Sequence, residues 1–487
     1  MTPQQQEFIR MVQSTDDNIL LDARAGTGKT TTLLSAIEGL NIPILALAFN
    51  KSIQQELSKK LPQGATAKTF NGLGHVTWGN QIGRRCIVST SKSYDIILSL
   101  IKEDEDSWGD AYRHLGELIS SMAAAKTIGL VPDEAPANPK GLVSDLAENW
   151  ESVADDNDLP EHFIPLLRQA LLRSIQDGWQ GNIDFNDQLY LPVIYRGPFP
   201  RGQYKLLIVD EAQDLSPIQH RMVEKTLGKA RLIAAGDPYQ SIYGFRGAAS
   251  DSMRLFQKKF SMTPCTLSVS FRVPHNITEH IRAEGHVEDI ESSETLPEGA
   301  VETWREWSPK DIPENATILC RTNAPVFNLA MQLLANGQRV QMLGRDLHKN
   351  LKKILDKNLG KDISETVAKL HNWLAEETQK ARIKSNRSKE RRLNDQYEAL
   401  IAILVNTKTV EETQQKLERM FSSKSGIILS TIHRVKGLEY QQVFILRRDL
   451  IPIGFAETPD EIQQEYNLLY VAQTRALSRL VYLEDQG

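Results

Sequence analysis

The sequence has few cysteines and no long apolar run, and each shortage excludes a class of protein. Only three of its 487 residues are cysteines, with no Cys-x-x-Cys spacing (Cys86, Cys265 and Cys320). This disfavours both a disulfide framework and a zinc site, and it fits a reducing compartment. No stretch approaches the roughly 20 apolar residues of a membrane span, and the first residues lack the features of a secretion signal. We therefore expect a cytoplasmic protein without a membrane partner.

The chain also lacks an excess of positive charge. Its formal net charge is −5, from 57 Lys and Arg against 62 Asp and Glu. Net charge governs solubility and long-range encounter, whereas binding of a polyanion depends on a local groove that can stay positive. A nucleic-acid partner is therefore not excluded. At this length one hydrophobic core is not enough, and we expect two or more domains.

An apolar run near the N-terminus leads into a glycine-rich turn. Residues 19–21 are Ile-Leu-Leu, and residues 23–30 read Ala-Arg-Ala-Gly-Thr-Gly-Lys-Thr. A strand that delivers the chain to such a turn, followed by a helix, is the arrangement that a phosphate-binding loop needs. The loop contains glycines for a sharp path, a lysine for the terminal phosphates and a hydroxyl for Mg²⁺, namely Gly26, Gly28, Lys29 and Thr30. An ordinary tight turn is the alternative, because Ala23 stands where the general pattern has glycine.

A second apolar run ends in two carboxylates. Residues 206–209 are Leu-Leu-Ile-Val, and Asp210 and Glu211 follow. Four successive apolar residues predict a strand that is buried on both faces of a parallel sheet. Carboxylates at its carboxyl end would face the same crevice as the phosphate loop. There Asp210 can hold Mg²⁺, and Glu211 can orient a water against the γ-phosphate. An acidic loop in solvent is the alternative.

Ordered blocks along the chain resemble the UvrD/Rep branch of superfamily 1 helicases. Residues 210–214 read Asp-Glu-Ala-Gln-Asp, and residues 236–248 read Gly-Asp-Pro-Tyr-Gln-Ser-Ile-Tyr-Gly-Phe-Arg-Gly-Ala. Further matches, in family order, are Gln5 and the segments 68–73, 184–189, 270–272, 431–440 and 470–476. Together they cover nearly the whole chain. One departure is Asn71, where the family usually has histidine.

The resemblance implies an ATP site in the cleft between two domains. Gln5 is expected to read adenine and Phe271 to stack on it, while Arg272 and Arg475 act as arginine fingers. Gln240 is expected to sense the γ-phosphate or the attacking water, and Glu439 to touch the ribose or couple the site to the strand. A surface ion pair is the alternative for Arg475. The expected catalytic residues are Lys29, Asp210, Glu211, Gln240, Arg272 and Arg475, and the expected metal ligands are Thr30 and Asp210. The expected ATP-binding residues are Gln5, Ala23, Arg24, Ala25, Gly26, Thr27, Gly28, Lys29, Thr30, Thr31, Phe271, Arg272, Glu439 and Arg475.

The resemblance also implies contacts with single-stranded DNA. Aromatic rings stack on bases without reading their sequence, and polar or basic side chains hold phosphates. Phe245 stands where the family usually has a stacking tryptophan or another aromatic. For Phe49 and Phe70, packing in the core is the alternative, and Phe49 is shifted by one position from the commonest family form. The expected DNA-binding residues are Phe49, Asn50, Lys51, Thr69, Phe70, Asn71, Tyr243, Phe245, Arg246 and His433.

The strongest basic run lies at residues 380–392, where seven of thirteen residues are Lys or Arg. Such a run is often a solvated helix or a disordered segment. The functional alternative is contact with the phosphates of duplex DNA ahead of the motor.

The motifs divide the chain into two sheet-bearing halves. We expect an α/β fold with two RecA-like parallel-sheet P-loop domains, each with a mainly helical insertion. The first domain is expected at 1–87 and 181–273, with its insertion at 88–180. The second is expected at 274–345 and 425–487, with a short basic insertion at 346–424. This organisation predicts a compact motor without an appended nuclease domain.

These expectations combine into an ATP- and Mg²⁺-dependent translocase that moves along single-stranded DNA and unwinds tailed duplexes. Resemblance to the UvrD/Rep branch, carried by residues 436–439 (Lys-Gly-Leu-Glu), implies 3′→5′ movement. We expect a monomeric core, associated with DNA in the cytoplasm or in a eukaryotic nucleus. The alternatives are a translocase that strips bound proteins with little unwinding and a nucleotide-gated nucleic-acid-binding scaffold. RNA also stays open as the substrate, because backbone and stacking contacts discriminate sugars poorly.

Overall fold

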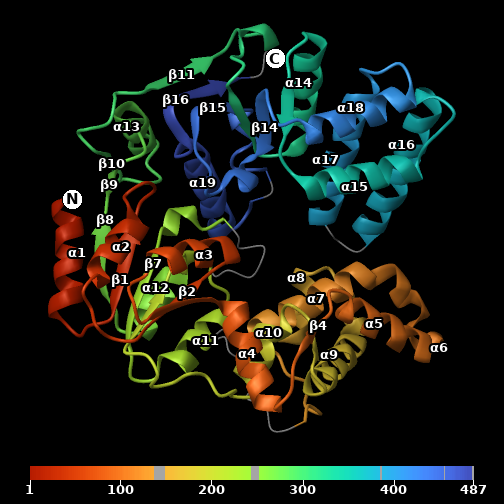
Figure 1. Ribbon diagram of the computed structural model, residues 1–487. Helices are drawn as coiled ribbons and strands as arrows, with labels where there is room; N and C mark the ends of the chain where they lie inside the picture. Colours follow the sequence, from red (N-terminus) through yellow and green to blue (C-terminus); the bar gives the residue numbers. More distant parts are fainter. Residues whose placement is uncertain (137–148, 243–251, 384–386, 455, 485–487) are drawn as a thin grey trace. The chain divides into compact units, whose positions relative to one another are not determined.

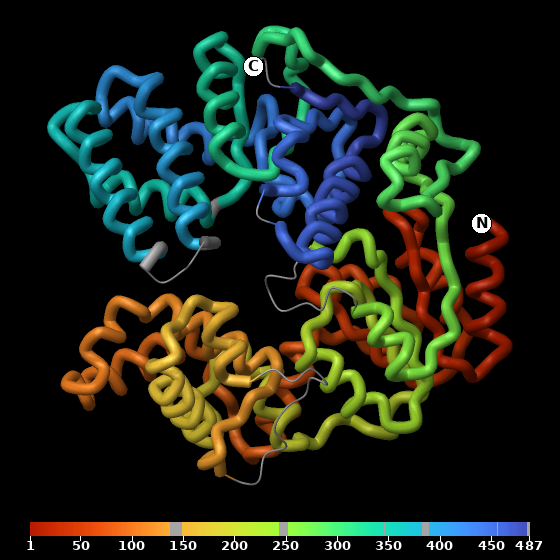
Figure 2. The backbone as a smooth tube through the Cα atoms, turned by 180° about the vertical axis from the view of Figure 1, so that it is seen from behind, coloured from red at the N-terminus to blue at the C-terminus, as the bar shows by residue number. Residues whose placement is uncertain are grey.

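The computed structural model describes residues 1–136, 149–242, 252–383, 387–454 and 456–484 (Figure 1; seen from behind in Figure 2). The chain forms two compact units, one made of Met1–Ala23 and Gly28–Leu267, the other of Arg24–Thr27 and Ser268–Gly487. Each unit holds a six-stranded sheet. This confirms the expected α/β class with two RecA-like domains. No helix among the described residues is both long and apolar enough to cross a bilayer.

The sheet of the first unit has the strand order β3-β2-β6-β7-β1-β8, and all neighbouring strands are parallel. The strands are β1 (Ile19–Ala23), β2 (Ile44–Ala48), β3 (Ala65–Thr69), β6 (Leu206–Val209), β7 (Arg231–Gly236) and β8 (Thr263–Leu267). Successive residues of a strand point to opposite faces. All four residues of β6 are buried, so both faces of the sheet are covered there, as the apolar run predicted.

Two layers of helices cover this sheet. On one face, Ile19 and Leu21 join a core with residues of α1 (Pro3–Ser14), α2 (Lys29–Ile37) and α3 (Lys51–Lys60). On the other face, Leu20 joins a core with residues of α4 (Phe70–Ile82), α10 (Asp187–Ile194), α11 (Pro217–Leu227) and α12 (Ser252–Lys259). Because the strands are parallel, the loops that follow them leave from one edge of the sheet.

The first unit carries a helical insertion that begins and ends at a pair of short strands. β4 (Ile87–Val88) pairs in parallel with β5 (Asn182–Ile183). Between them lie α5 (Lys92–Glu103), α6 (Glu105–Trp108), α7 (Leu115–Ile128), α8 (Trp150–Asp156) and α9 (Ile164–Trp179). Figures 1 and 2 show these helices grouped beside α4 and α10. Their apolar side chains belong to the same core as those of α4 and α10, so the insertion is packed onto the sheet domain of its own unit.

The sheet of the second unit has the order β11-β16-β15-β12-β14-β13, again with parallel neighbours. The strands are β11 (Ala300–Trp304), β12 (Thr317–Cys320), β13 (Val340–Met342), β14 (Ile427–Thr431), β15 (Tyr440–Leu446) and β16 (Ala476–Leu483). The helices α13 (His275–Ala283), α14 (Asn323–Ala335) and α19 (Pro459–Gln473) pack against it. The short strands β9 (Val269–Ser270) and β10 (Glu291–Ser292) form a separate parallel pair.

The second unit also carries an insertion, and this one shares a core with its sheet domain. It contains α15 (Arg345–Lys357), α16 (Ile363–Ile383), α17 (Arg387–Leu404) and α18 (Val410–Ser422). Leu351 and Leu400 of the insertion lie in one hydrophobic cluster with Ile318 of β12 and Phe327 of α14. Figure 1 shows α15 to α18 beside α14. The predicted basic run spans the end of α16 and the start of α17, and its residues 384–386 lie outside the described part of the chain.

The N-terminus of α14 is capped by a residue of the insertion. Asp395 of α17 accepts the backbone N–H groups of Asn323 and Ala324 at 2.8 Å each, through Oδ1. Its Oδ2 accepts Asn323 Nδ2 at 2.7 Å. A carboxylate at a helix N-terminus satisfies free N–H groups and interacts favourably with the helix dipole. Polar contacts therefore add to the apolar contacts between insertion and sheet domain.

Candidate functional site

The glycine-rich turn links β1 to α2. Gly26 and Gly28 both have φ = 76°, in the left-handed region that favours glycine. A Cβ atom at Gly26 would also collide with Arg272 and Ser270. Gly28 is the N-cap of α2, whose first residue is Lys29. The turn therefore has the backbone geometry with which a helix N-terminus binds an anion.

The side chain of Lys29 lies between the two carboxylates that follow β6. Its Nζ is 2.9 Å from Asp210 Oδ1 and 2.7 Å from Glu211 Oε1. Burial alone would lower the pKa of Lys29, but the charges of Asp210 and Glu211 outweigh burial and raise that pKa above its ordinary value. The ammonium group is therefore charged at neutral pH. Glu211 has φ = 55°, a conformation uncommon for a residue with a side chain and concentrated at functional sites.

A buried glutamine, to which the sequence analysis gave no role, joins this acidic pair to the segment after β7. Gln213 is 1% exposed; its Nε2 donates to Glu211 Oε2 at 2.5 Å, and its Oε1 accepts the Asp237 N–H at 3.1 Å. A Cβ atom at Gly236 would collide with Gln213 Oε1. Beyond it, Gln240 Nε2 donates to Asp237 Oδ2 at 2.7 Å. The signal in the sequence that could have indicated Gln213 is its position as a polar residue just after the predicted buried strand at 206–209.

The oxygen ligands predicted for Mg²⁺ belong to the same edge of the first sheet. Thr30 lies in the first turn of α2, and Asp210 directly follows β6. Mg²⁺ prefers oxygen ligands, and it commonly takes one or two carboxylates from the protein and the rest from water and phosphates. The described residues contain no cluster of three or more His, Cys, Asp or Glu that could hold a metal. A hydroxyl and a carboxylate fit Mg²⁺ that is shared with a phosphate group.

The apex of the loop, Arg24–Thr27, belongs to the second unit and is held within it. Nε and Nη2 of Arg24 donate to the two carboxylate oxygens of Asp289 at 2.7 and 2.6 Å. The Ala25 N–H donates to the Tyr470 hydroxyl at 2.9 Å, and Ser270 Oγ donates to Ala25 O at 2.7 Å. The guanidinium of Arg24 is thus paired with a carboxylate of its own unit, and its role as an ATP-binding residue stays a prediction.

Two residues expected near the base and the γ-phosphate differ in how they are held. Phe271 is 43% exposed, and its N–H donates to Gly26 O at 2.8 Å. This bond fixes the backbone of Phe271 against the loop apex while its ring stays accessible. Arg272 forms an ion pair with Glu439. The Arg272 side chain is therefore partly neutralised before any nucleotide binds.

Arg475 is one of the most enclosed of the expected site residues in the second unit. It is 1% exposed. Its Nε donates to Val471 O at 2.9 Å, its Nη1 to Leu438 O at 3.2 Å and its Nη2 to Thr474 Oγ1 at 3.0 Å. The alternative of a surface ion pair is therefore excluded. Three of the five N–H groups of this guanidinium are therefore already engaged within the second unit.

Gln5 lies at the start of α1, next to the glycine-rich turn. Its Oε1 accepts the Thr2 N–H at 2.9 Å, and Thr2 Oγ1 accepts the Gln5 N–H at 3.2 Å. These two bonds form a capping box. The amide nitrogen Nε2 of Gln5 lies 3.3 Å from where a Cβ atom of Gly28 would stand. The capping box thus places the amide of Gln5 beside the phosphate loop.

Residues expected to contact DNA follow two neighbouring strands. The last residues of β2 and β3, Ala48 and Thr69, are paired in register. Asn50 caps α3 by accepting the Ile53 N–H at 2.9 Å, and Thr69 caps α4 by accepting the Gly72 N–H at 3.0 Å. The exposed members of this group are Asn50 and Lys51, and the half-buried ones are Phe49, Thr69 and Asn71. They leave the sheet from the same edge as the phosphate loop and the two carboxylates.

The prediction that Phe70 stacks on bases is wrong. Its side chain is 0% exposed and lies in the core that α4 shares with α10. Phe70 is the first residue of α4, and the packing of that helix on the sheet turns the ring inward. Of the two alternatives for Phe70, core packing is therefore the correct one.

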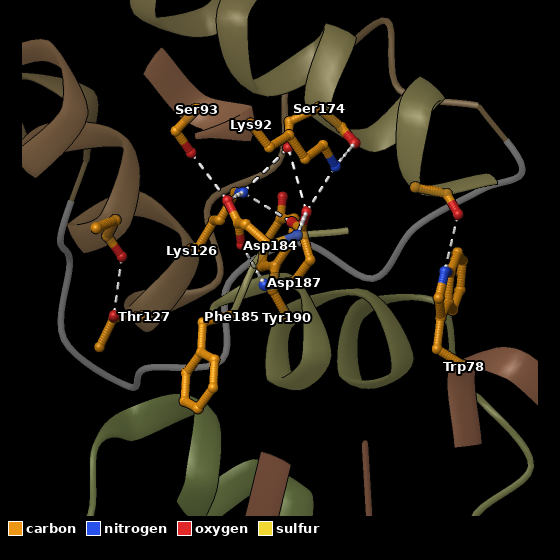
Figure 3. Close-up of polar contacts among 12 residues, drawn as sticks. Trp78, Lys92, Ser93, Lys126, Thr127, Ser174, Asp184, Phe185, Asp187 and Tyr190 are labelled. Atoms are coloured by element: carbon orange, nitrogen blue, oxygen red, sulfur yellow. Dashed lines mark hydrogen bonds and ion pairs between the residues drawn. The ribbon is translucent and has the colours of Figure 1, made fainter. Parts of the chain in front are cut away.

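The structure presents a different aromatic ring at this part of the first unit. Phe185 lies between β5 and α10 and is 65% exposed. Asn71 Nδ2 donates to the carbonyl oxygen of Phe185 at 2.8 Å. In Figure 3 its ring points away from a buried cluster of lysines and aspartates. The segment 184–189 resembles the family, but no pattern in the sequence singles out its phenylalanine.

Three expected DNA-binding residues, Tyr243, Phe245 and Arg246, lie outside the described residues. His433, in the second unit, is half-buried in the short helix Ile432–Val435 that follows β14.

Comparison with known families gives two matches. Residues 1–261 match the UvrD/REP helicase N-terminal domain, and residues 426–483 match the UvrD-like helicase C-terminal domain. The first match alone covers more than half of the chain.

Individual relatives match over different shares of the chain. F-box DNA helicase protein 1 of Schizosaccharomyces pombe is 22% identical over 530 residues, which include 99% of this chain and 57% of that protein. F-box DNA helicase 1 of Gallus gallus is 23% identical over 553 residues, with 98% and 48% covered. ATP-dependent DNA helicase UvrD2 of Mycobacterium tuberculosis is 25% identical over 332 residues, with 57% and 47% covered. The chain spans about half the length of these relatives. On the family match and the geometry above, the chain belongs to the UvrD/Rep helicase family.

Proposed function

We propose that this chain hydrolyses Mg-ATP to move 3′→5′ along single-stranded DNA and to unwind tailed duplexes. The observation that carries the proposal is Lys29, at the N-terminus of α2 and within 2.9 Å of Asp210 and 2.7 Å of Glu211. A lysine and carboxylates that converge behind a glycine-rich turn are the parts with which P-loop enzymes bind and cleave a terminal phosphate. Relatives named DNA helicases support DNA as the polymer. The direction of movement rests on the family resemblance.

Hydrolysis requires that Lys29 change partners. When a nucleotide binds, the ammonium group moves from the two carboxylates to the terminal phosphates, where the opposite charge is greater. This frees Glu211 to orient the attacking water. Bound Mg²⁺, held by Thr30 and Asp210, would neutralise charge on the phosphates as a Lewis acid. Gln240, tied to Asp237 at 2.7 Å, is the residue proposed to sense the γ-phosphate.

Arg272 and Arg475 are proposed to stabilise the charge of the transferring phosphoryl group. Each already has partners in the second unit: Glu439 for Arg272, and hydrogen-bond acceptors of that unit for Arg475. Binding of the γ-phosphate exchanges these partners, and loss of the phosphate restores them. A ligand biases a two-state element only through such differential contacts, so nucleotide state would select between two arrangements of these arginines.

The polymer is proposed to lie along the residues that follow β2 and β3. Asn50 and Lys51 offer polar and charged groups to phosphates, while Phe49 and Phe185 offer rings to bases. Stacking contributes about 1–3 kcal/mol per base and tolerates any sequence. The motor would therefore bind single strands without strong sequence preference.

Strand separation on duplexes with a 3′ or a 5′ single-stranded tail tests this proposal, with ATP hydrolysis measured in parallel. We expect unwinding from the 3′ tail only, and hydrolysis stimulated by single-stranded DNA. Lys29→Ala should abolish both activities, and normal turnover in that variant would contradict the phosphate-loop assignment. Unwinding from the 5′ tail would contradict the proposed direction, and equal unwinding from an RNA tail would contradict the preference for DNA. DNA-stimulated hydrolysis without unwinding would favour a protein-stripping translocase.

A further inference from the structure

Four charged side chains are buried together where the first insertion meets its sheet domain (Figure 3). Lys92 lies on α5 and Lys126 on α7, while Asp184 follows β5 and Asp187 is the first residue of α10. Lys126 Nζ is 2.6 Å from Asp184 Oδ2 and 2.7 Å from Asp187 Oδ1. Lys92 Nζ is 2.6 Å from Asp187 Oδ2. None of the four side chains is more than 11% exposed.

Stability alone does not account for this cluster. Burial of a charge has a large desolvation cost, and well-packed apolar residues often serve as well or better in its place. Apolar side chains of α5, α7, α9 and α10 also pack together in one core around this contact. What directional ion pairs add is a defined geometry. Ser174 of α9 strengthens that definition, because its O accepts Lys92 Nζ at 2.7 Å and its Oγ accepts Lys126 Nζ at 3.0 Å.

The geometry that the cluster defines is that of one short turn. The Asp184 N–H donates to Asp187 Oδ2 at 3.0 Å, and the Asp187 N–H donates to Asp184 Oδ1 at 2.8 Å. The carboxylates that close the turn are the ones that the two lysines hold. Phe185 lies in this turn and is 65% exposed, although both aspartates beside it are buried. Asn71 fixes the carbonyl oxygen of Phe185 from the side of α4.

We propose that Lys92 and Lys126 are positioning residues that hold Phe185 as a stacking surface for a base of single-stranded DNA. The inference rests on the proposed function and deepens it. It assigns a role in DNA binding to two lysines of the helical insertion, which act through Phe185 and do not contact the DNA there themselves. A ring on a fixed backbone loses little conformational freedom when a base stacks on it. A ring on a loose turn must be ordered first, and that ordering weakens binding.

The test removes one charge of each sign from the cluster. Lys126→Met combined with Asp184→Asn leaves the pair of Lys92 and Asp187, and asparagine keeps an oxygen for the Asp187 N–H. We expect the concentration of single-stranded DNA for half-maximal ATP hydrolysis to rise about 5- to 150-fold, the range that corresponds to loss of one stacked base. The maximal rate and the rate without DNA should stay the same. Quenching of 2-aminopurine in a bound oligonucleotide should fall in parallel.

A matched control removes an ion pair of the same insertion outside the cluster. Arg173 Nη1 and Glu103 Oε1 are 2.7 Å apart and join α9 to α5. Arg173→Met with Glu103→Gln should bind DNA as the unaltered chain does. If the first double variant does not fold, as judged by its melting curve, Lys92→Met with Asp187→Asn takes its place and leaves the pair of Lys126 and Asp184.

Combination with Phe185→Ala separates positioning from general weakening. If the lysines act through the ring, Phe185→Ala weakens DNA binding by itself, and the cluster variant adds no further loss to it. Losses that multiply would overturn the inference, as would unaltered DNA binding in the cluster variant. In either case Phe185→Ala would still report on the proposed function. If the unaltered chain shows no DNA-stimulated hydrolysis, the proposed function itself fails.

Discussion

Replacement of Gln213 by leucine tests whether this buried amide positions Glu211 for hydrolysis. The change removes the 2.5 Å hydrogen bond to Glu211 and leaves the Asp237 N–H without its acceptor at 3.1 Å. A hydrogen bond to a charged group contributes about 1.5–3 kcal/mol, and an unsatisfied buried donor costs about 1–3 kcal/mol. The apolar leucine offsets part of this. We therefore expect the free energy of unfolding to fall by about 2–4 kcal/mol.

The catalytic effect of Gln213→Leu should appear in kcat. A positioned general base contributes roughly 10²- to 10⁴-fold, and a Glu211 without its anchor should lose part of that, about 10- to 100-fold. The KM for ATP should change little, because the glycine-rich turn and Lys29 are untouched. Steady-state hydrolysis on saturating single-stranded DNA, with urea unfolding of the same samples, measures both effects.

Gln219→Leu is the matched control. Gln219 is also a buried glutamine, and its Oε1 accepts the N–H and the Oγ of Ser216 at 2.9 and 3.0 Å. Its loss removes a capping box of α11 and should reduce stability by about 0.5–2 kcal/mol without a change in kcat. If Gln213→Leu and Gln219→Leu lowered kcat equally, or if Gln213→Leu left kcat intact, the positioning role of Gln213 would be refuted.

Three further predictions concern the acidic pair, the buried cluster and the basic run. Glu211→Gln should retain ATP and DNA binding but lose at least about 100-fold in hydrolysis, and brisk turnover would remove Glu211 from the water-orienting role. Burial would raise the pKa of Asp184, but Lys126 and the hydrogen bonds to Asp184 outweigh burial and lower it. Its contribution to stability is therefore present above about pH 4 and is lost as the pH falls further. Unfolding measured between about pH 5 and pH 3 should show this loss, and an equal pH dependence in Asp184→Asn would contradict it. Neutralising the basic residues of 380–392 should reduce the salt dependence of duplex binding by about one unit of slope per phosphate contact, whereas an unchanged slope would leave a solvated helix as the explanation.

The sequence predicted best what depends on local pattern. The apolar runs at 19–21 and 206–209 became buried parallel strands, and the turn at 23–30 joins β1 to α2. Glycine at 26 and 28 was informative because the left-handed conformation found there is one that side chains disfavour.

Contacts between distant segments were not predictable in the same way. Whether Phe70 faces solvent or core depends on how α4 packs on the sheet and on α10. The residues next to Phe70 in the sequence do not predict that packing. Lys126 and Asp184 are 58 positions apart, and a lysine in a helical segment reads as solvated until the partner is known. The pairing of Arg24 with Asp289 spans 265 positions. In each case the residue type was visible, but the neighbour that gives it a role was not.

The core that α15 to α18 share with β12 and α14 has a mechanical consequence. To swing these helices away as an independent body, the chain would have to expose Leu400 and Leu351 to water and uncap α14 at Asp395. Both steps are costly. A force applied at the far end of α16 or α17 would therefore be transmitted to the strands of the second sheet. Excision of residues 346–424 would in turn expose the apolar side chains of β12 and α14 that pack against the insertion, and we expect the remaining chain to aggregate.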